Sequence, residues 1–244
     1  MTTLAKRTST PVAALTIAGL ILHQLVTRSR LISLGALGLL VAGLGAATRA
    51  SDNEAEAATH LIAGLGLSVV APVATLVVAS AALGEMRDDK TLVYLWLRPI
   101  SRASIAAGAV LASLAVALPM VVLPVVVSAV LSGVGELIGA SALAASMAVV
   151  AYTGLFVAMG MRVNRPFIWG LAYILVWEGF VALAGDGAAR LSIRSYTWTI
   201  LHRGTGVDLR LADRSATASV LVPVLILIAG TALTTRWLIR REID

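Results

Sequence analysis

The chain has 244 residues, of which 59% are apolar and only 13% are charged, and its mean hydropathy is +0.92. A soluble domain of this length needs more polar surface to cover its core, so a soluble globular fold is excluded. The net charge of +6 comes from bases at the ends of apolar runs, which membrane topology and anionic lipid explain without nucleic-acid binding. The absence of cysteine excludes disulfides, thiolate metal sites and cysteine nucleophiles.

Apolar runs long enough to cross a membrane recur along the chain. A helix of about 20 residues crosses a hydrocarbon layer roughly 30 Å thick, and helices satisfy their own backbone polar groups in lipid. We therefore expect an all-α polytopic membrane protein that forms one transmembrane domain over residues 1–244. Six spans are predicted, at about 31–48, 60–83, 105–131, 137–161, 166–184 and 218–238. Pro119 and Pro124 predict that the third span is kinked or broken.

The first apolar stretch, residues 11–30, differs from these spans because it ends in polar and basic residues. Pro11 suits the first turn of a helix, and Arg28 and Arg30 close the stretch. The pattern predicts a helix that lies in the membrane interface with its bases toward the lipid headgroups. A true span is the alternative interpretation.

Orientation follows from the distribution of Lys and Arg. If the amino terminus is cytoplasmic, thirteen of the 19 bases lie in cytoplasmic segments, and five of the other six lie in one outward loop. The short connectors then obey the positive-inside rule, with both termini cytoplasmic. Six spans give this parity.

The segment 84–102, GEMRDDKTLVYLWLRPISR, separates the second and third spans and is expected to be cytoplasmic. Acids at its start, an apolar-periodic run in its middle, and Arg98 before Pro99 predict a short amphipathic helix that stops at the proline. Such a helix either rests on the bilayer or docks into a groove of a partner protein.

This segment resembles the signature of membrane subunits of bacterial type-two ABC exporters, which carry E-x-x-x-(D/G)-x-T-L-x-x-L-x-x-R-P-(I/V)-(S/P)-R between their second and third spans. The residues that match or adjoin this pattern are Glu85, Asp88, Asp89, Thr91, Leu92, Tyr94, Leu95, Arg98, Pro99, Ile100 and Arg102. WEGF at 177–180 and LSIRSY at 191–196 are similar to one bacterial branch. The family arrangement, with an amino-terminal interfacial helix, six spans and a large outward region between spans five and six, fits the predicted topology.

The resemblance implies a permease subunit in the bacterial inner membrane that passes an unidentified amphiphilic substrate outward by alternating access. It implies that the chain has no catalytic site and binds no cofactor, and the chain contains no G-x-x-x-x-G-K-(S/T) loop. A separate cytoplasmic ABC ATPase would hold ATP and Mg²⁺ and would drive the spans through the 84–102 helix. A second permease chain, identical or a sister, would complete the pathway. The competing hypothesis is a non-ABC membrane enzyme or scaffold whose 84–102 helix rests on the bilayer.

Glu178 is the one acid that falls clearly inside a predicted span, which makes it a functional candidate because a carboxylate in the membrane is costly. An arginine of the following loop, Arg190 or Arg194, is the predicted partner. That ion pair, or a hydrogen bond that anchors the outer helices, competes with a role in substrate contact at an outer gate. Residues 185–216 are expected to form short helices that re-enter the outer leaflet, with Trp198 at the interface, either as an exit gate or as a cap on the dimer.

Overall fold

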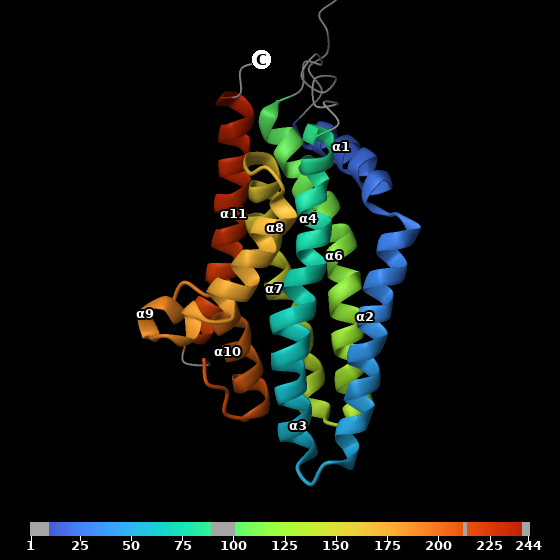
Figure 1. Ribbon diagram of the computed structural model, residues 1–244, viewed down its shortest axis with the longest axis vertical. Coiled ribbons are helices and arrows are strands. Elements are labelled where there is room, and N and C mark those ends of the chain that lie inside the picture. The colour runs from blue at the N-terminus through green and yellow to red at the C-terminus, as the bar shows by residue number, and fades with distance from the viewer. Residues whose placement is uncertain (1–9, 89–100, 212–213, 241–244) are drawn as a thin grey trace, which may run out of the picture.

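The structure, a computed structural model, describes residues 10–88, 101–211 and 214–240, and over these residues it is helical without any strand. Long helices lie side by side and form an elongated bundle (Figure 1). Five of the described helical runs are long and apolar enough to cross a membrane: Arg28–Ala50, Glu54–Arg87, Arg102–Ser132, Gly135–Arg162 and Ala216–Arg240. The prediction of an all-α, membrane-embedded protein is therefore confirmed.

The described α-helices, in chain order, are α1 (Thr10–Leu25), α2 (Arg28–Ala47), α3 (Glu54–Leu61), α4 (Ala71–Asp88), α6 (Arg102–Ser132), α7 (Gly135–Arg162), α8 (Pro166–Ala172), α9 (Asp186–Ala189), α10 (Ile193–Thr205) and α11 (Ala216–Arg240). Short 3₁₀ turns cover Thr48–Ala50 and Val181–Leu183. Two π-helical segments, Ile62–Val70 and Tyr173–Glu178, continue α3 and α8. The second predicted span is thus one run from α3 through a π-helical segment into α4.

The amino-terminal helix ends earlier than predicted. α1 stops at Leu25, and Thr27 takes an extended conformation (φ −108°, ψ 147°) before α2 begins at Arg28. Two consecutive β-branched residues, Val26 and Thr27, stand at the break, where their lower helix propensity is favourable to an interruption. The predicted single helix over 11–30 is therefore divided, because Arg28 and Arg30 belong to α2.

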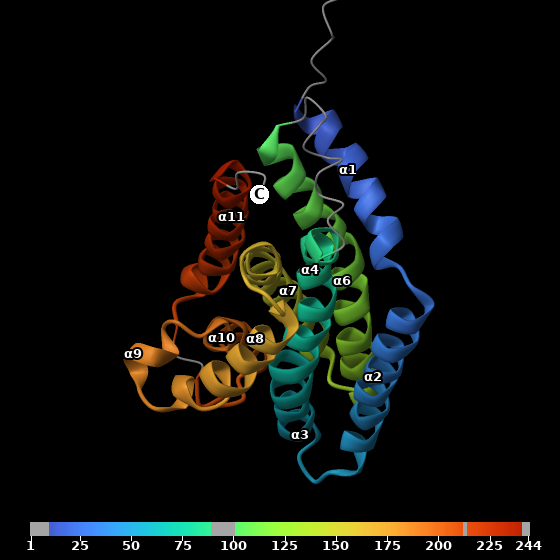
Figure 2. The same ribbon diagram turned by 45° about the horizontal axis from the view of Figure 1, so that its top comes forward.

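α1 is an apolar helix of 16 residues that packs lengthwise on the first half of α6. Its length is short of the roughly 20 residues that a span needs. Ile17 and Ile21 are buried, whereas Val12 and Leu15 are more than half exposed. A side chain at Gly108 of α6 would overlap Ile17, so the glycine allows α1 to lie directly on α6. Figures 1 and 2 show α1 inclined to α2 near the top of the bundle.

Of the two expectations for the third span, a kink or a break at its prolines, the break does not occur, because the span is one continuous helix. α6 runs from Arg102 to Ser132 through Pro119 and Pro124. Prolines are tolerated in membrane helices when neighbouring helices pack around them. Here the ring of Pro124 fills the space beside Gly38 of α2, where any Cβ would overlap it.

The predicted fifth span, 166–184, is shorter than expected. α8 contributes 7 residues and the π-helical segment that follows contributes 6, after which the helix ends at Glu178. The chain then turns through α9 into α10, which packs against α7 and α11 (Figure 2). Within 185–216, the part of the expected re-entrant region that packs against the bundle is α10, its longest described helix.

α7 is the central helix, in contact with α4, α6, α10 and α11. Its closest approach to α11 lies at Gly154 and Gly230, where a Cβ on either residue would overlap backbone atoms of the other helix. Such backbone contact between small residues is the usual means by which membrane helices associate without a hydrophobic driving force. The packing fixes the frame in which α4 and α10 present the two candidate sites.

Candidate functional site

The predicted coupling segment is described only at its two ends. Glu85 and Asp88 lie in the last turns of α4, and Arg102 is the first residue of α6. The remaining candidates of this segment lie outside the described residues: Asp89, Thr91, Leu92, Tyr94, Leu95, Arg98 and Pro99. The described ends therefore show what the segment is attached to.

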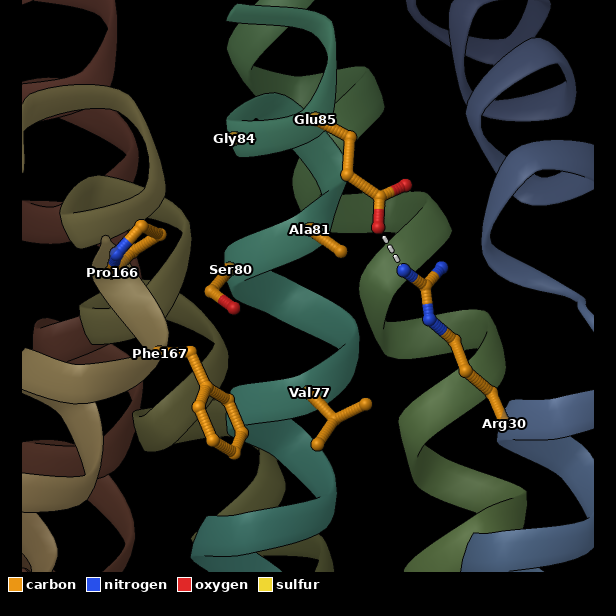
Figure 3. A pocket seen from close by; sticks show the side chains of 8 residues that line it. All are labelled: Arg30, Val77, Ser80, Ala81, Gly84, Glu85, Pro166 and Phe167. Atoms are coloured by element: carbon orange, nitrogen blue, oxygen red, sulfur yellow. Dashed lines mark hydrogen bonds and ion pairs between the residues drawn. The ribbon is translucent and has the colours of Figure 1, made fainter. Parts of the chain in front are cut away.

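Glu85 joins three helices. Its carboxylate forms an ion pair with Arg30 Nη2 at the start of α2 and accepts a hydrogen bond from Gln24 Nε2 of α1 at 3.1 Å. Arg30 Nη1 also lies 3.4 Å from the Gln24 carbonyl oxygen. Figure 3 shows Arg30 reaching toward the Glu85 carboxylate on α4. We name Gln24, Arg30 and Glu85 the Glu85 cluster; it ties the α1–α2 break to the end of α4.

The same end of α4 is tied to α7 and α8. Arg87 Nη1 donates to the carbonyl oxygen of Val163 at 2.7 Å, in the turn between α7 and α8. Arg165, the residue before α8, takes the left-handed conformation (φ 57°), and Pro166 then starts the helix. A proline suits that position because its missing N–H has no partner in a first helical turn. The end of α4 is therefore hydrogen-bonded to the turn that precedes α8.

The far end of the coupling segment is capped locally. Ser101 precedes α6 in an extended conformation, and its Oγ accepts from the backbone N–H of Ser104 at 3.1 Å. A serine in this position satisfies one of the free N–H groups of the first turn. The predicted turn before the third span therefore ends at Ser101, and α6 begins at once.

Glu178 lies in a second, buried cluster. It is 2% exposed and accepts hydrogen bonds from four donors: Tyr173 Oη at 3.0 Å, Ser192 Oγ at 2.5 Å, and the backbone N–H groups of Ile193 at 2.9 Å and Arg194 at 3.3 Å. We name these five residues the Glu178 cluster. Two of the donors are the first backbone N–H groups of α10, so the carboxylate caps this helix from another element and faces the positive end of its dipole.

The predicted ion pair between Glu178 and an arginine does not form. Four donors already occupy the carboxylate, and neither Arg190 nor Arg194 lies within salt-bridge distance of it. Arg190 is exposed, and its carbonyl oxygen accepts from Tyr196 Oη at 2.7 Å. The hydrogen-bonded anchor, which was the predicted alternative to the ion pair, is the arrangement present.

Arg194 points instead toward an aromatic face. Its guanidinium carbon lies 5.2 Å from the centroid of the Trp198 ring, one turn further along α10, which is a favourable distance for a cation–π contact. The residue is only 9% exposed, and its Nε and Nη2 atoms are buried without a hydrogen-bond partner. The guanidinium is therefore stabilised by the Trp198 ring.

Trp198 connects α10 to the second span, an interaction that the sequence did not indicate. Its Nε1–H lies 3.0 Å from the carbonyl oxygen of Ala63 and 3.2 Å from Ser68 Oγ. Ser68 Oγ itself donates to the Ala63 carbonyl at 2.7 Å inside the π-helical segment Ile62–Val70. The indole N–H is therefore satisfied within the protein. The only available signal was the tryptophan in a polar stretch.

The two clusters hold and position helices. Among the described residues, no group of three His, Asp or Glu side chains converges as metal ligands do. No family model matches this chain, and no curated protein matches it.

Proposed function

We propose that the chain is the membrane subunit of a bacterial ATP-driven ABC exporter. In this proposal α8 and its π-helical continuation form a short fifth span, so that the five long runs and this one make six. Both termini face the cytoplasm, and the chain pairs with an identical or sister permease. A separate ATPase binds the 84–102 segment, and an amphiphilic substrate moves outward by alternating access.

The observation that carries the proposal is the attachment of the coupling segment. The segment begins within the last turns of α4, where Glu85 and Arg87 contact α1, α2 and the α7–α8 turn. A force applied by an ATPase to the segment would therefore reach several spans at once. A helix that merely rested on lipid would have no need of such attachments.

The Glu178 cluster has a complementary role in this mechanism. It fixes the start of α10 to the end of the short fifth span, and Trp198 fixes the middle of α10 to the second span. We propose that α10 moves with these two spans as one unit and closes the outer side of the pathway. In this proposal Glu178 and Arg194 position the gate, and neither contacts substrate.

The first experiment identifies the partner. The tagged chain, extracted in mild detergent, should copurify with a protein that carries a G-x-x-x-x-G-K-(S/T) nucleotide-binding loop. If no such partner is recovered with or without a non-hydrolysable ATP analogue, the hypothesis of a non-ABC enzyme or scaffold is favoured.

The second experiment tests coupling in the reconstituted complex. Glu85→Ala should lower the ATPase stimulation that the permease confers by about fivefold or more, since mechanical coupling between sites is commonly 1–3 kcal/mol. Arg98→Ala should act in the same direction. Glu136→Ala removes an exposed acid from the first turn of α7 and is the matched control. Full coupling in both Glu85→Ala and Arg98→Ala would refute the assigned role of the segment.

A further inference from the structure

A groove lies beside the Glu85 cluster, on the outer face of α4. Its volume is about 230 Å³, and its floor is formed by Val77, Ser80, Ala81 and Gly84. Ser80, Ala81 and Gly84 have small side chains or none, so they do not fill the groove. Figure 3 shows Arg30 on one side of α4 and Phe167 on the other, with this floor between them.

The groove is charged at one end and mainly apolar along the rest of its length. Glu85 and Arg30 supply one negative and one positive charge at one end, whereas Val77 lies two helical turns deeper, about 12 Å away at 1.5 Å per residue. Phe167 adds an apolar wall that is 46% exposed. A charged end followed by an apolar channel matches the division of a phospholipid into headgroup and acyl chain.

The position of the groove places it at a membrane boundary. Arg30, Arg87 and Arg162 lie at the ends of long apolar helices, the usual level of the headgroups. Beyond Phe167 along α8, Ile168 and Trp169 are 55% and 60% exposed, as expected of side chains that face lipid. The charged end is therefore at headgroup depth, and the floor extends toward the hydrocarbon.

We propose that this groove binds one phospholipid that carries a primary amine in its headgroup. The phosphate contacts Arg30, the ammonium contacts Glu85, and an acyl chain lies along Val77, Ala81 and Phe167. The Glu85 side chain is 39% exposed and the Arg30 side chain 20%, so both retain a face toward the groove while they contact each other.

The two charges specify the headgroup. A purely anionic headgroup satisfies Arg30 but is repelled by Glu85, and a choline headgroup offers the carboxylate no N–H to bind. A phosphoethanolamine headgroup satisfies both. This site is independent of the proposed function, because it requires only that the bundle be embedded in a bilayer.

The test is native mass spectrometry of the full chain, delipidated in detergent and titrated with dioleoyl phosphatidylethanolamine, phosphatidylcholine or phosphatidylglycerol. We expect one tightly retained ethanolamine lipid, bound about fivefold more tightly than either of the others, as one headgroup-level charge contact provides. Equal retention of the three lipids, or preference for phosphatidylglycerol, would overturn the headgroup assignment.

Matched variants locate the site. Arg30→Gln should remove the preference, whereas Arg28→Gln, which deletes the same charge from an exposed position in the same turn of α2, should preserve it. Phe167→Ala should weaken retention about twofold to threefold through lost van der Waals contact, and Ile168→Ala, at the next and more exposed position, should not. If Arg30→Gln does not fold, the comparison of Phe167→Ala with Ile168→Ala tests the location of the site instead. Identical behaviour within that pair would refute the site.

A second copy of this chain is the competing occupant. Because the chain has no cysteine, Phe167→Cys introduces the only thiol. We expect it to remain reactive toward a maleimide in ethanolamine-lipid-free detergent and to be protected when the lipid is added. Disulfide cross-linking of two copies through position 167 in the lipid-bound state would overturn the proposal.

Discussion

The Glu85 and Glu178 clusters each use a carboxylate to join helices, but they do so in opposite ways. Glu85 is partly exposed and is held by the side chains of Arg30 and Gln24, both long and flexible. Glu178 is 2% exposed and is held by two backbone N–H groups and two hydroxyls. An exposed ion pair contributes little to stability and is easily broken. A buried carboxylate with four donors is costly to disturb.

Because of this difference, the contacts of Glu85 can be broken readily, whereas those of Glu178 are fixed. A contact worth a fraction of a kcal/mol is easily made and broken, whereas one whose loss leaves buried donors without acceptors is not. If the chain is the proposed exporter subunit, the Glu85 cluster would change during transport, and the Glu178 cluster would keep α10 aligned.

The largest effect is expected when Glu178 is removed. Glu178→Ala should lower the free energy of unfolding by about 3–5 kcal/mol, because it leaves two N–H groups of α10 and the Ser192 hydroxyl buried without an acceptor. Thermal unfolding in detergent micelles measures the loss. Glu178→Gln keeps one acceptor oxygen and should cost less than half as much. A Glu178→Ala protein as stable as the wild type would contradict the anchoring role.

Loss of the tryptophan link should have an intermediate effect. Trp198→Phe keeps an aromatic ring but deletes the N–H that contacts Ala63 and Ser68, and it should cost about 1–2 kcal/mol. Trp169→Phe, on the exposed face of α8, is the matched control and should be neutral. Thermal unfolding again provides the measurement. Equal losses from both variants would show that the hydrogen bonds of Trp198 are irrelevant.

A weaker coupling is expected in the Glu85 cluster. A double-mutant cycle of Arg30→Gln and Glu85→Gln should yield a coupling energy of about 0.5–1 kcal/mol, since both side chains are partly exposed. The corresponding cycle with Arg28→Gln should yield none, because that residue is exposed on the same turn of α2. A coupling energy as large as the loss from Glu178→Ala would erase the distinction between the clusters.

The smallest effect is the response of the two clusters to salt. The screening length falls from about 10 Å at 0.1 M salt to about 3 Å at 1 M, which weakens exposed pairs and hardly affects buried ones. The Arg30–Glu85 coupling energy should therefore shrink in high salt, while the cost of Glu178→Ala stays constant. Repeating both unfolding measurements across this range checks the prediction. A salt-sensitive Glu178 would indicate that water reaches its cluster.

The local sequence predicted the limits of helices well where the thickness of the bilayer sets the length of an apolar run. The limits of α6, α7 and α11 lie within a few residues of the predicted spans, because a hydrophobic run must match the bilayer thickness. It was less informative about interruptions. The break at Val26–Thr27 lies beside the Glu85 cluster, and the π-helical segment Ile62–Val70 contacts Trp198, so both involve partners that are distant in the sequence.

The Glu178 site shows the same limit. The cost of a carboxylate inside a span identified Glu178 as a residue with a required partner. The identity of that partner depends on the tertiary structure. The chain turns back through α9, which places the first backbone N–H groups of α10, and not an arginine side chain, against the carboxylate.

Composition and hydropathy alone therefore determine that this is a helical membrane protein, where its long helices run, and which segments carry its unusual charges. These properties follow from the transfer of each residue between water and lipid, which depends on local sequence. The tertiary structure decides which charged groups meet, because these contacts join residues as far apart as Arg30 and Glu85, or Ala63 and Trp198. Their geometry is set by helix packing at positions such as Gly154 and Gly230, where backbone contact fixes how closely two helices approach.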